Sequence, residues 1–268
     1  MDAAPDSLIR SSGDLFRRLL MPLLVATAWL GLPAQAQQAA DNGWHYVIEP
    51  YVMFPNMKGT AGVGVLPDAS VDEDPSDIFS HLQIGAMLYA EAHNDLWAVS
   101  SDLLYMKLKS DVQPGTLLNS GAVELSQLGW ELALLRRVSP WLELGAGVTY
   151  NTIESEVSLV LNPGGSAAPI LARKMDEDWI DPSLLARATF PLSEKWFLRA
   201  RGNIGGFGVG SDFMWQVQVD AGYRISNRAY FTLGYRVIDV DYEHGSGSDR
   251  FLYNMSTFGP VMRFGFNF

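Results

Sequence analysis

Apolar and polar residues alternate with a period of two along most of the chain after residue 43. The segment 212–225 is the most regular: odd positions carry Trp215, Val217, Val219, Ala221, Tyr223 and Ile225, and even positions carry Gln216, Gln218, Asp220, Gly222 and Arg224. Successive side chains of a strand point to opposite faces, so the pattern predicts strands with one apolar face. We predict ten, at residues 44–56, 82–92, 96–109, 122–138, 141–157, 178–190, 195–208, 212–225, 229–242 and 250–268.

The connections between these strands alternate in length. Four are short, at residues 93–95, 139–140, 192–194 and 226–228, and most others are longer, at residues 57–81, 110–121, 158–177 and 243–249, with 209–211 as the exception. Outer-membrane barrels have short periplasmic turns and longer extracellular loops, and a tilted strand needs about 9–11 residues to cross. The sequence therefore predicts an all-β fold: a transmembrane, up-and-down antiparallel β-barrel of about ten strands, with a range of eight to twelve.

The first predicted strand is the least regular. Pro55 and Asn56, followed by Gly59, Gly62 and Gly64, could bend the strand or begin another hairpin arm. A split there gives eleven strands, and pairing of residues 66–80 as well gives twelve. Residues 76–80 resemble instead a short helical turn that begins with a Ser76 cap.

Aromatic residues follow the four short turns closely. Trp97, Trp141 and Trp196 come within two residues of three of them, and Tyr230 follows the fourth. Aromatics repeated at one height favour the girdle found where an outer-membrane barrel meets the membrane interface. The alternative is ordinary strand composition, because aromatic residues favour strands anyway.

The chain ends on alternating aromatics, with Phe264, Phe266 and Phe268 on one face of the last strand. This ending resembles the C-terminal signature of bacterial outer-membrane β-barrels, and the chain is similar to the porin-like, OmpA-type or OmpW-type group. The resemblance implies that Phe264, Phe266 and Phe268 form a signal read by the barrel assembly machinery. It also implies outer-membrane lipid and lipopolysaccharide as surroundings. It leaves the oligomeric state open.

The N-terminal region predicts export. Arg10, Arg17 and Arg18 precede an apolar run at 19–32, and Ala34-Gln35-Ala36 follows. A basic flank, a short apolar core and a small-x-small site are typical of a secretory signal peptide. The alternative, an uncleaved anchor helix, would need about 20 apolar residues. We therefore expect a signal peptide at 1–36, a barrel domain at 37–268 and location in the outer membrane.

Composition narrows the function classes. The 268 residues include no cysteine, which excludes disulfides, thiolate metal sites and cysteine nucleophiles. A net charge of −11 argues against nucleic-acid binding, which requires clustered basic residues. A soluble sandwich or lipocalin-like barrel would share the alternation, but the leader and the terminal phenylalanine favour the membrane barrel.

The polar faces of the predicted strands would line the lumen, and their alternation places seven acids and seven arginines there. These are Glu49, Glu91, Asp102, Glu131, Glu143, Asp181, Asp220, Arg137, Arg187, Arg199, Arg201, Arg224, Arg236 and Arg263. In the strand 195–208 a slip of one residue would turn both arginines to lipid, at about 2–4 kcal/mol each. Arginine forks suit bidentate pairing with carboxylates, so we expect a lumen closed by ion pairs. A narrow pore for small solutes is the alternative.

Acidic residues gather at the predicted extracellular end, as Asp68, Asp72, Glu73, Asp74, Asp77, Asp176, Glu177, Asp178, Asp239, Asp241, Glu243 and Asp249. Such carboxylates could hold Ca²⁺ or Mg²⁺, but no EF-hand spacing occurs. Charge runs usually face water. We therefore predict solvated acidic loops, with no metal or cofactor site.

Catalytic chemistry finds little support. Omptin-like proteases use rim aspartates with a histidine–aspartate pair, which Asp239, Asp241 and His244 approach on a single strand and its loop. Barrel enzymes that cleave lipids use a serine–histidine pair, and no serine here lies in a Gly-x-Ser-x-Gly setting. His45 and His93 fall at the periplasmic end, and His81 at the outer end. We predict a non-enzymatic barrel with no catalytic residues, and an enzyme at the outer rim remains the alternative.

Overall fold

The computed structural model describes residues 43–65, 67–112, 118–161 and 170–268. The predicted signal peptide at 1–36 lies outside the described residues, and so does the start of the predicted domain 37–268. No helix in the described ranges is long and apolar enough to cross a membrane.

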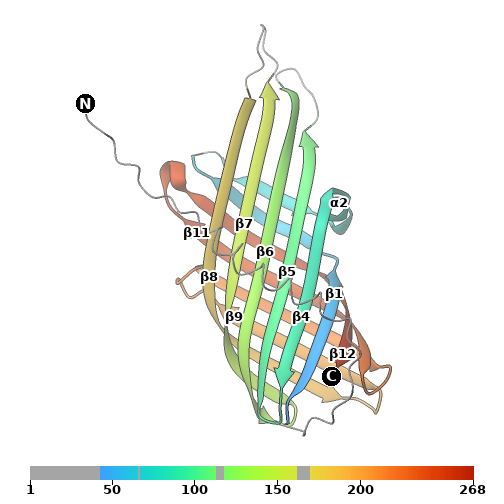
Figure 1. Cartoon of the computed structure of the whole chain (residues 1–268). Coiled ribbons are helices and arrows are strands. Elements are labelled where there is room, and N and C mark those ends of the chain that lie inside the picture. Colours follow the sequence, from blue (N-terminus) through green and yellow to red (C-terminus); the bar gives the residue numbers. More distant parts are fainter. Residues whose placement is uncertain (1–42, 66, 113–117, 162–169) are drawn as a thin grey trace, which may run out of the picture. The chain divides into compact units, whose positions relative to one another are not determined.

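Ten antiparallel strands form a closed barrel (Figure 1). They are β1 (His45–Met53), β4 (Leu82–His93), β5 (Trp97–Val112), β6 (Leu118–Ser139), β7 (Leu142–Leu161), β8 (Ile170–Pro191), β9 (Trp196–Gly205), β10 (Phe213–Arg224), β11 (Ala229–His244) and β12 (Phe251–Asn267). From β4 onward each strand pairs with its neighbour in sequence, and β1 pairs with both β4 and β12. The predicted barrel of about ten strands is confirmed.

Two further strands extend the wall past the end of β1, where the first of them also pairs with β12. β2 (Asn56–Val63) and β3 (Ala69–Glu73) bring the sheet to twelve strands. β1 and β2 pair with β12 in one continuous register, with Met53 opposite Val261 and Asn56 opposite Phe258. Only Phe54 and Pro55 separate β1 from β2. The strand is interrupted there because proline has no N–H to donate to the ladder. The single predicted strand 44–56 was therefore too short, and residues 69–73 pair as the twelve-strand alternative required.

A short helix, α2 (Pro75–His81), follows β3, packs against β5 and buries Ile78. The helical turn was predicted, but its Ser76 cap was wrong. The cap is Asp74, whose Oδ1 accepts from the backbone N–H groups of Ser76 (2.7 Å) and Asp77 (3.0 Å). These bonds lower the pKa of the Asp74 carboxyl, with the bond from Asp77 as the largest cause.

The strands β5 to β8 are longer than predicted and project beyond the rest of the wall (Figure 1). Residues assigned to loops at 110–121 and 158–177 are largely strand, because the pairing continues to Val112 opposite Gly121 and to Val160 opposite Ile170. The alternation used for prediction fades before these strands end.

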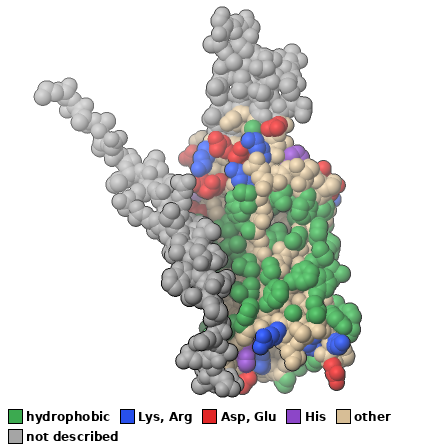
Figure 2. All heavy atoms as spheres, turned by 45° about the vertical axis from the view of Figure 1, so that its right-hand side comes forward, with side chains coloured by type: hydrophobic (Ala, Val, Ile, Leu, Met, Phe, Trp, Pro, Cys, Tyr) green, Lys and Arg blue, Asp and Glu red, His purple; other side chains and the backbone are tan. Residues whose placement is uncertain are grey.

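The side of the barrel seen in Figure 2 carries an apolar band on its outer face, with charged side chains at both ends. Exposed apolar side chains of the wall include Leu88, Val99, Leu134, Leu144, Ile180, Leu184, Val217, Leu233, Phe264 and Phe266. Arg201 faces inward and is 8% exposed, as the alternation predicted.

Asp181 on β8 anchors the tight connection between β9 and β10, which lies at the end of the barrel opposite to the four short turns. Its Oδ1 accepts from the N–H of Ser211 (2.6 Å), and its Oδ2 accepts from Ser211 Oγ (2.8 Å), Trp179 Nε1 (2.9 Å) and Asn151 Nδ2 (3.1 Å). The turn approaches so closely that a Cβ on Gly210 would lie 2.5 Å from the Ile180 carbonyl. The buried Asp181 carboxylate therefore fixes the β9–β10 connection to β8 just beyond the last β8–β9 pair, Ser183 with Gly205.

Replacing Asp181 with alanine should destabilise the barrel, because four donors lose a buried acceptor. We expect the free energy of unfolding to fall by about 2–4 kcal/mol, measured by urea unfolding in detergent micelles. The matched control is Asp212→Ala, since Asp212 is exposed in the same turn, and it should change stability by less than about 0.5 kcal/mol. Equal effects of the two substitutions would contradict the role of Asp181.

Candidate functional site inside the barrel

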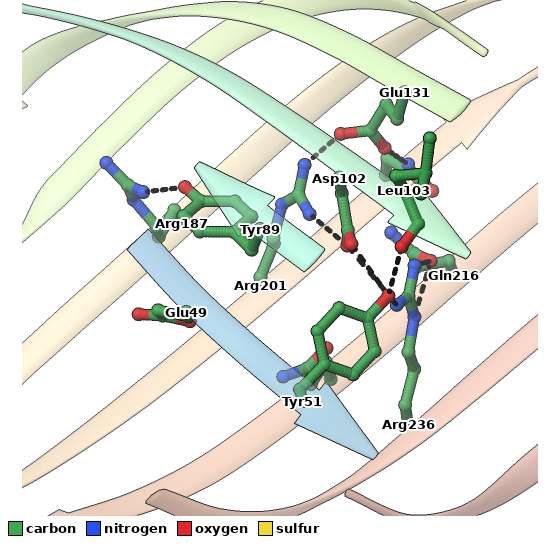
Figure 3. Close-up of polar contacts among 12 residues, drawn as sticks. Glu49, Tyr51, Tyr89, Asp102, Leu103, Glu131, Arg187, Arg201, Gln216 and Arg236 are labelled. Atoms are coloured by element: carbon green, nitrogen blue, oxygen red, sulfur yellow. Dashed lines mark hydrogen bonds and ion pairs between the residues drawn. The ribbon is translucent and has the colours of Figure 1, made fainter. Parts of the chain in front are cut away.

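The middle of the lumen is filled by buried ion pairs, which we call the charge layer: Glu49, Asp102, Glu131, Arg199, Arg201, Arg236 and Arg263. Asp102 lies at its centre (Figure 3). Its Oδ2 is 3.2 Å from Arg236 Nη1, 3.5 Å from Arg201 Nη1 and 3.8 Å from Arg263 Nη2. The Tyr51 hydroxyl donates to Asp102 Oδ1 over 2.7 Å. One carboxylate thus joins arginines from β9, β11 and β12.

Two glutamates complete the charge layer. Glu131 on β6 accepts from Arg201 and from Asn203 Nδ2 (2.6 Å). Glu49 on β1 pairs with Arg199 Nη1 (2.9 Å) and Arg263 Nη1 (3.3 Å). Glu49 is 1% exposed, so its charge depends on these partners rather than on water.

A second ion-pair group lies nearer the end of the barrel that carries the four short turns at residues 93–95, 139–140, 192–194 and 226–228, which we call the short-turn end. Arg187 contacts Glu91 and donates from Nε to Glu143 Oε2 (2.6 Å). Glu143 is also 3.4 Å from Arg137 Nη2. The Tyr89 hydroxyl accepts from Arg187 Nη1 over 2.8 Å (Figure 3). It donates to Glu91.

The structure therefore brings together eleven of the fourteen charges assigned to the lumen from the sequence, five carboxylates and six arginines. Among the described residues the other three have no ion pair. Asp181 holds the β9–β10 turn, and Asp220 accepts from Gln218 Nε2 (2.8 and 2.9 Å). Arg224 donates to the Glu194 carbonyl (3.2 Å) and lies over the Phe197 ring.

Tyrosines are the lumen residues that the sequence analysis missed. Tyr51 and Tyr89 each stand two residues from a predicted lumen acid, so strand alternation could have identified both. Tyr230 was wrongly assigned to the aromatic girdle: it is 7% exposed and donates to Glu49, whereas Trp97, Trp141 and Trp196 are exposed. Its ring lies over Gly265 on β12, where a Cβ would collide with it.

On the side of the charge layer away from the four short turns, the lumen is filled largely by apolar side chains. A buried cluster, the apolar cap, consists of Met57, Ile78, Met106, Ile153, Trp179, Met214, Val240, Tyr242, Phe251, Tyr253 and Met255. Trp179 on β8 stacks on Tyr242 on β11, with ring centroids 4.1 Å apart and an angle of 11° between the planes. The prediction of a charge-filled lumen did not include this layer.

Three cavities follow one another inside the barrel. The largest, about 580 Å³, is the vestibule, which lies among the short turns and is lined by Arg137, Arg187, Arg199, Arg224 and the aromatic residues beside them. A cavity of about 20 Å³ lies within the charge layer, between Glu49, Tyr89, Arg201 and Arg263. A third of about 70 Å³ separates Asp102 and Glu131 from Trp179 and Met214.

The candidate catalytic residues do not converge. Asp239 and Asp241 lie on the outer face of β11, where they accept from Ser256 and from Asn254 Nδ2 (3.2 Å). His244 follows the inward-facing Val240 and Tyr242 and is 3.6 Å from Glu177. His45 and His93 lie together at the short-turn end, with ring centroids 5.7 Å apart, and His81 ends α2.

The acidic rim is partly neutralised by its own basic residues. Arg250 Nη1 and Nε lie 2.6 Å from Asp68 and 2.6 Å from Glu243. The hydrogen bonds from Arg250 lower the pKa of the Asp68 carboxyl. Within the described ranges, no group of three or more His, Cys, Asp or Glu side chains is arranged to hold a metal ion.

Comparison with known proteins reveals the fold but no sequence relative. No protein-family model matches the chain, and no curated protein matches it. The outer-membrane protease OmpT from Escherichia coli is structurally similar at a TM-score of 0.50 and 10% identity, over 84% of this chain and 97% of that one. This chain has the fold of an outer-membrane β-barrel. At 10% identity the likeness extends to the fold alone.

Two weaker similarities are to outer-membrane proteins of other kinds. Ail, the attachment invasion locus protein of Yersinia pestis, matches at a TM-score of 0.36 and 7% identity, over 84% of this chain and 99% of that one. A FadL homologue from Pseudomonas aeruginosa matches at 0.36 and 9% identity, over 84% and 90%. At these scores neither bears on function.

Removing Asp102 should destabilise the charge layer, because three buried arginines would share one carboxylate fewer. We expect Asp102→Ala to lower the free energy of unfolding by about 3–5 kcal/mol, measured by urea unfolding in micelles. Asp95→Ala, at an exposed position in a short turn, is the matched control and should be nearly neutral. A loss below about 1 kcal/mol for Asp102→Ala would show that the arginines do not depend on this carboxylate.

Proposed function

We propose that this protein is a non-enzymatic integral protein of the outer membrane whose lumen is closed. The observation that carries the proposal is the charge layer, where the cavity among Glu49, Tyr89, Arg201 and Arg263 measures about 20 Å³. A volume of that size holds about one water molecule. Hydrated solutes would have to displace paired, buried side chains to pass.

The apolar cap supports the same proposal independently. Methionine and aromatic side chains from both sides of the barrel meet above the charge layer, with Trp179 stacked on Tyr242. Apolar constrictions block ions by excluding water. Opening the lumen would therefore require disrupting two layers of different chemistry.

The outer surface supports a proposal about the surroundings and partners of the barrel. Phe264 and Phe266 on β12 and Phe268 just after it are exposed on the outside, at the end of the barrel that carries the four short turns. They support the proposal that outer-membrane lipid surrounds the barrel and that the assembly machinery reads this strand. Export through a signal peptide, periplasmic short turns and extracellular long hairpins belong to the same proposal.

Planar-bilayer recording tests the closed lumen. We expect the wild-type protein to show no stable unit conductance. The double variant Arg199→Ala, Arg201→Ala should also remain silent, because the apolar cap still blocks the lumen. The charge-matched control is Arg136→Ala with Lys195→Ala, since these residues lie over outward-facing aromatic rings at the short-turn end.

A stable wild-type conductance that changes in the lumen variant but not in the control would overturn the closed-barrel proposal. It would favour the narrow pore instead.

A further inference from the structure

The vestibule has the size and the composition of a small-molecule site. Its volume of about 580 Å³ lies within the range of ligand pockets, about 300–1,000 Å³. Residues of the turns at 140 and 226–227 and of the last strand at 267 lie at its border, so it opens at the short-turn end. Its inner limit lies at Tyr89 and at Glu49 of the charge layer.

Charges in the vestibule do not balance. Four arginines line it, against the three glutamates Glu49, Glu91 and Glu143, which leaves one positive charge. Arg137, Arg187 and Arg199 each pair with one or more of these glutamates. Arg224 has no carboxylate partner among the described residues. The excess charge is therefore located on Arg224, and it matches a monoanion.

Arg224 is held in place without a counter-ion. Its guanidinium carbon lies 4.9 Å from the centroid of the Phe197 ring, in the range of a cation–π contact. Phe197 in turn lies flat against Gly222, where a Cβ would collide with the ring. One hydrogen bond, to the Glu194 carbonyl, fixes the group further. These contacts leave most of the five N–H donors of the guanidinium for a ligand.

An apolar surface lies beside this cation. Val47, Phe197 and Tyr230 form a buried cluster from β1, β9 and β11, and all three line the vestibule. A ligand that contacts both the Arg224 cation and this apolar surface would carry one carboxylate on an apolar body. The planar fork of arginine matches the two oxygens of a carboxylate.

We propose that the vestibule binds a small organic monocarboxylate, with the carboxylate on Arg224 and the apolar body against Phe197, Tyr230 and Val47. The site lies on one side of the charge layer, so binding there does not depend on whether the lumen is closed.

The test uses benzoate as the probe, titrated into the full barrel in lipid nanodiscs with empty nanodiscs as blank. Benzamide, its uncharged analogue, should bind at least tenfold more weakly to the wild-type protein. Arg224→Gln should weaken benzoate binding at least tenfold, or about 1.4 kcal/mol. Arg136→Gln is the matched control, because it removes an exposed arginine from the outer wall at the same end, and it should leave binding unchanged.

Several results would overturn the proposal: no saturable benzoate binding, equal binding of benzamide, or equal loss in the two arginine variants. Inorganic phosphate that competes as well as benzoate would overturn it too, because a general attraction of anions would then suffice. The benzoate and benzamide comparison needs only the wild-type protein, so it decides the matter even if the Arg224 variant does not fold.

Discussion

Pairing of β1 with β12 is the constraint on which the rest of this structure depends. An unpaired strand edge leaves a row of backbone N–H and C=O groups without partners, and closing the sheet into a barrel removes such edges. Closure sets one inside and one outside for every strand, and alternation then assigns each side chain to the outer face or to the lumen. Arginines and carboxylates are thereby concentrated in a narrow space, where most of them pair with an opposite charge.

The lumen separates into layers because the two sheet halves differ in length. β5 to β8 and the β11–β12–β2 wall continue beyond the short β9–β10 turn. There the walls face each other across methionine and aromatic side chains, much as two sheets of a sandwich pack. Asp181 lies at the β9–β10 turn, beyond which the walls continue, and its hydrogen bonds to Ser211 fasten that turn to β8. The charge layer and the apolar cap thus lie one after the other in the lumen because the strands of this barrel differ in length.

Arg224 differs from the other lumen arginines in a way that has a simple geometric origin. It lies at the last inward position of β10, where the vestibule is wide and no acid stands opposite. Glycine at 222 lets Phe197 fold flat beneath it. Similar glycine and aromatic pairing at Gly265 and Tyr230 brings a hydroxyl to Glu49. Small residues on the wall therefore decide which polar groups reach the middle of the lumen.

Local alternation and turn chemistry were enough to predict the all-β barrel, the inward set of charges and the outward Phe264, because each depends only on neighbours along one strand. They missed the true ends of β5 to β8, the β2–β3 hairpin and the inward Tyr230. Those strand ends lack the apolar alternation, and an aromatic ring fits either face. Which arginine meets which carboxylate depends on register between strands up to 214 residues apart, as for Arg263 and Glu49. Only the closed tertiary structure decides such pairs, since side chains on distant strands meet across a lumen whose width and stagger no single segment encodes.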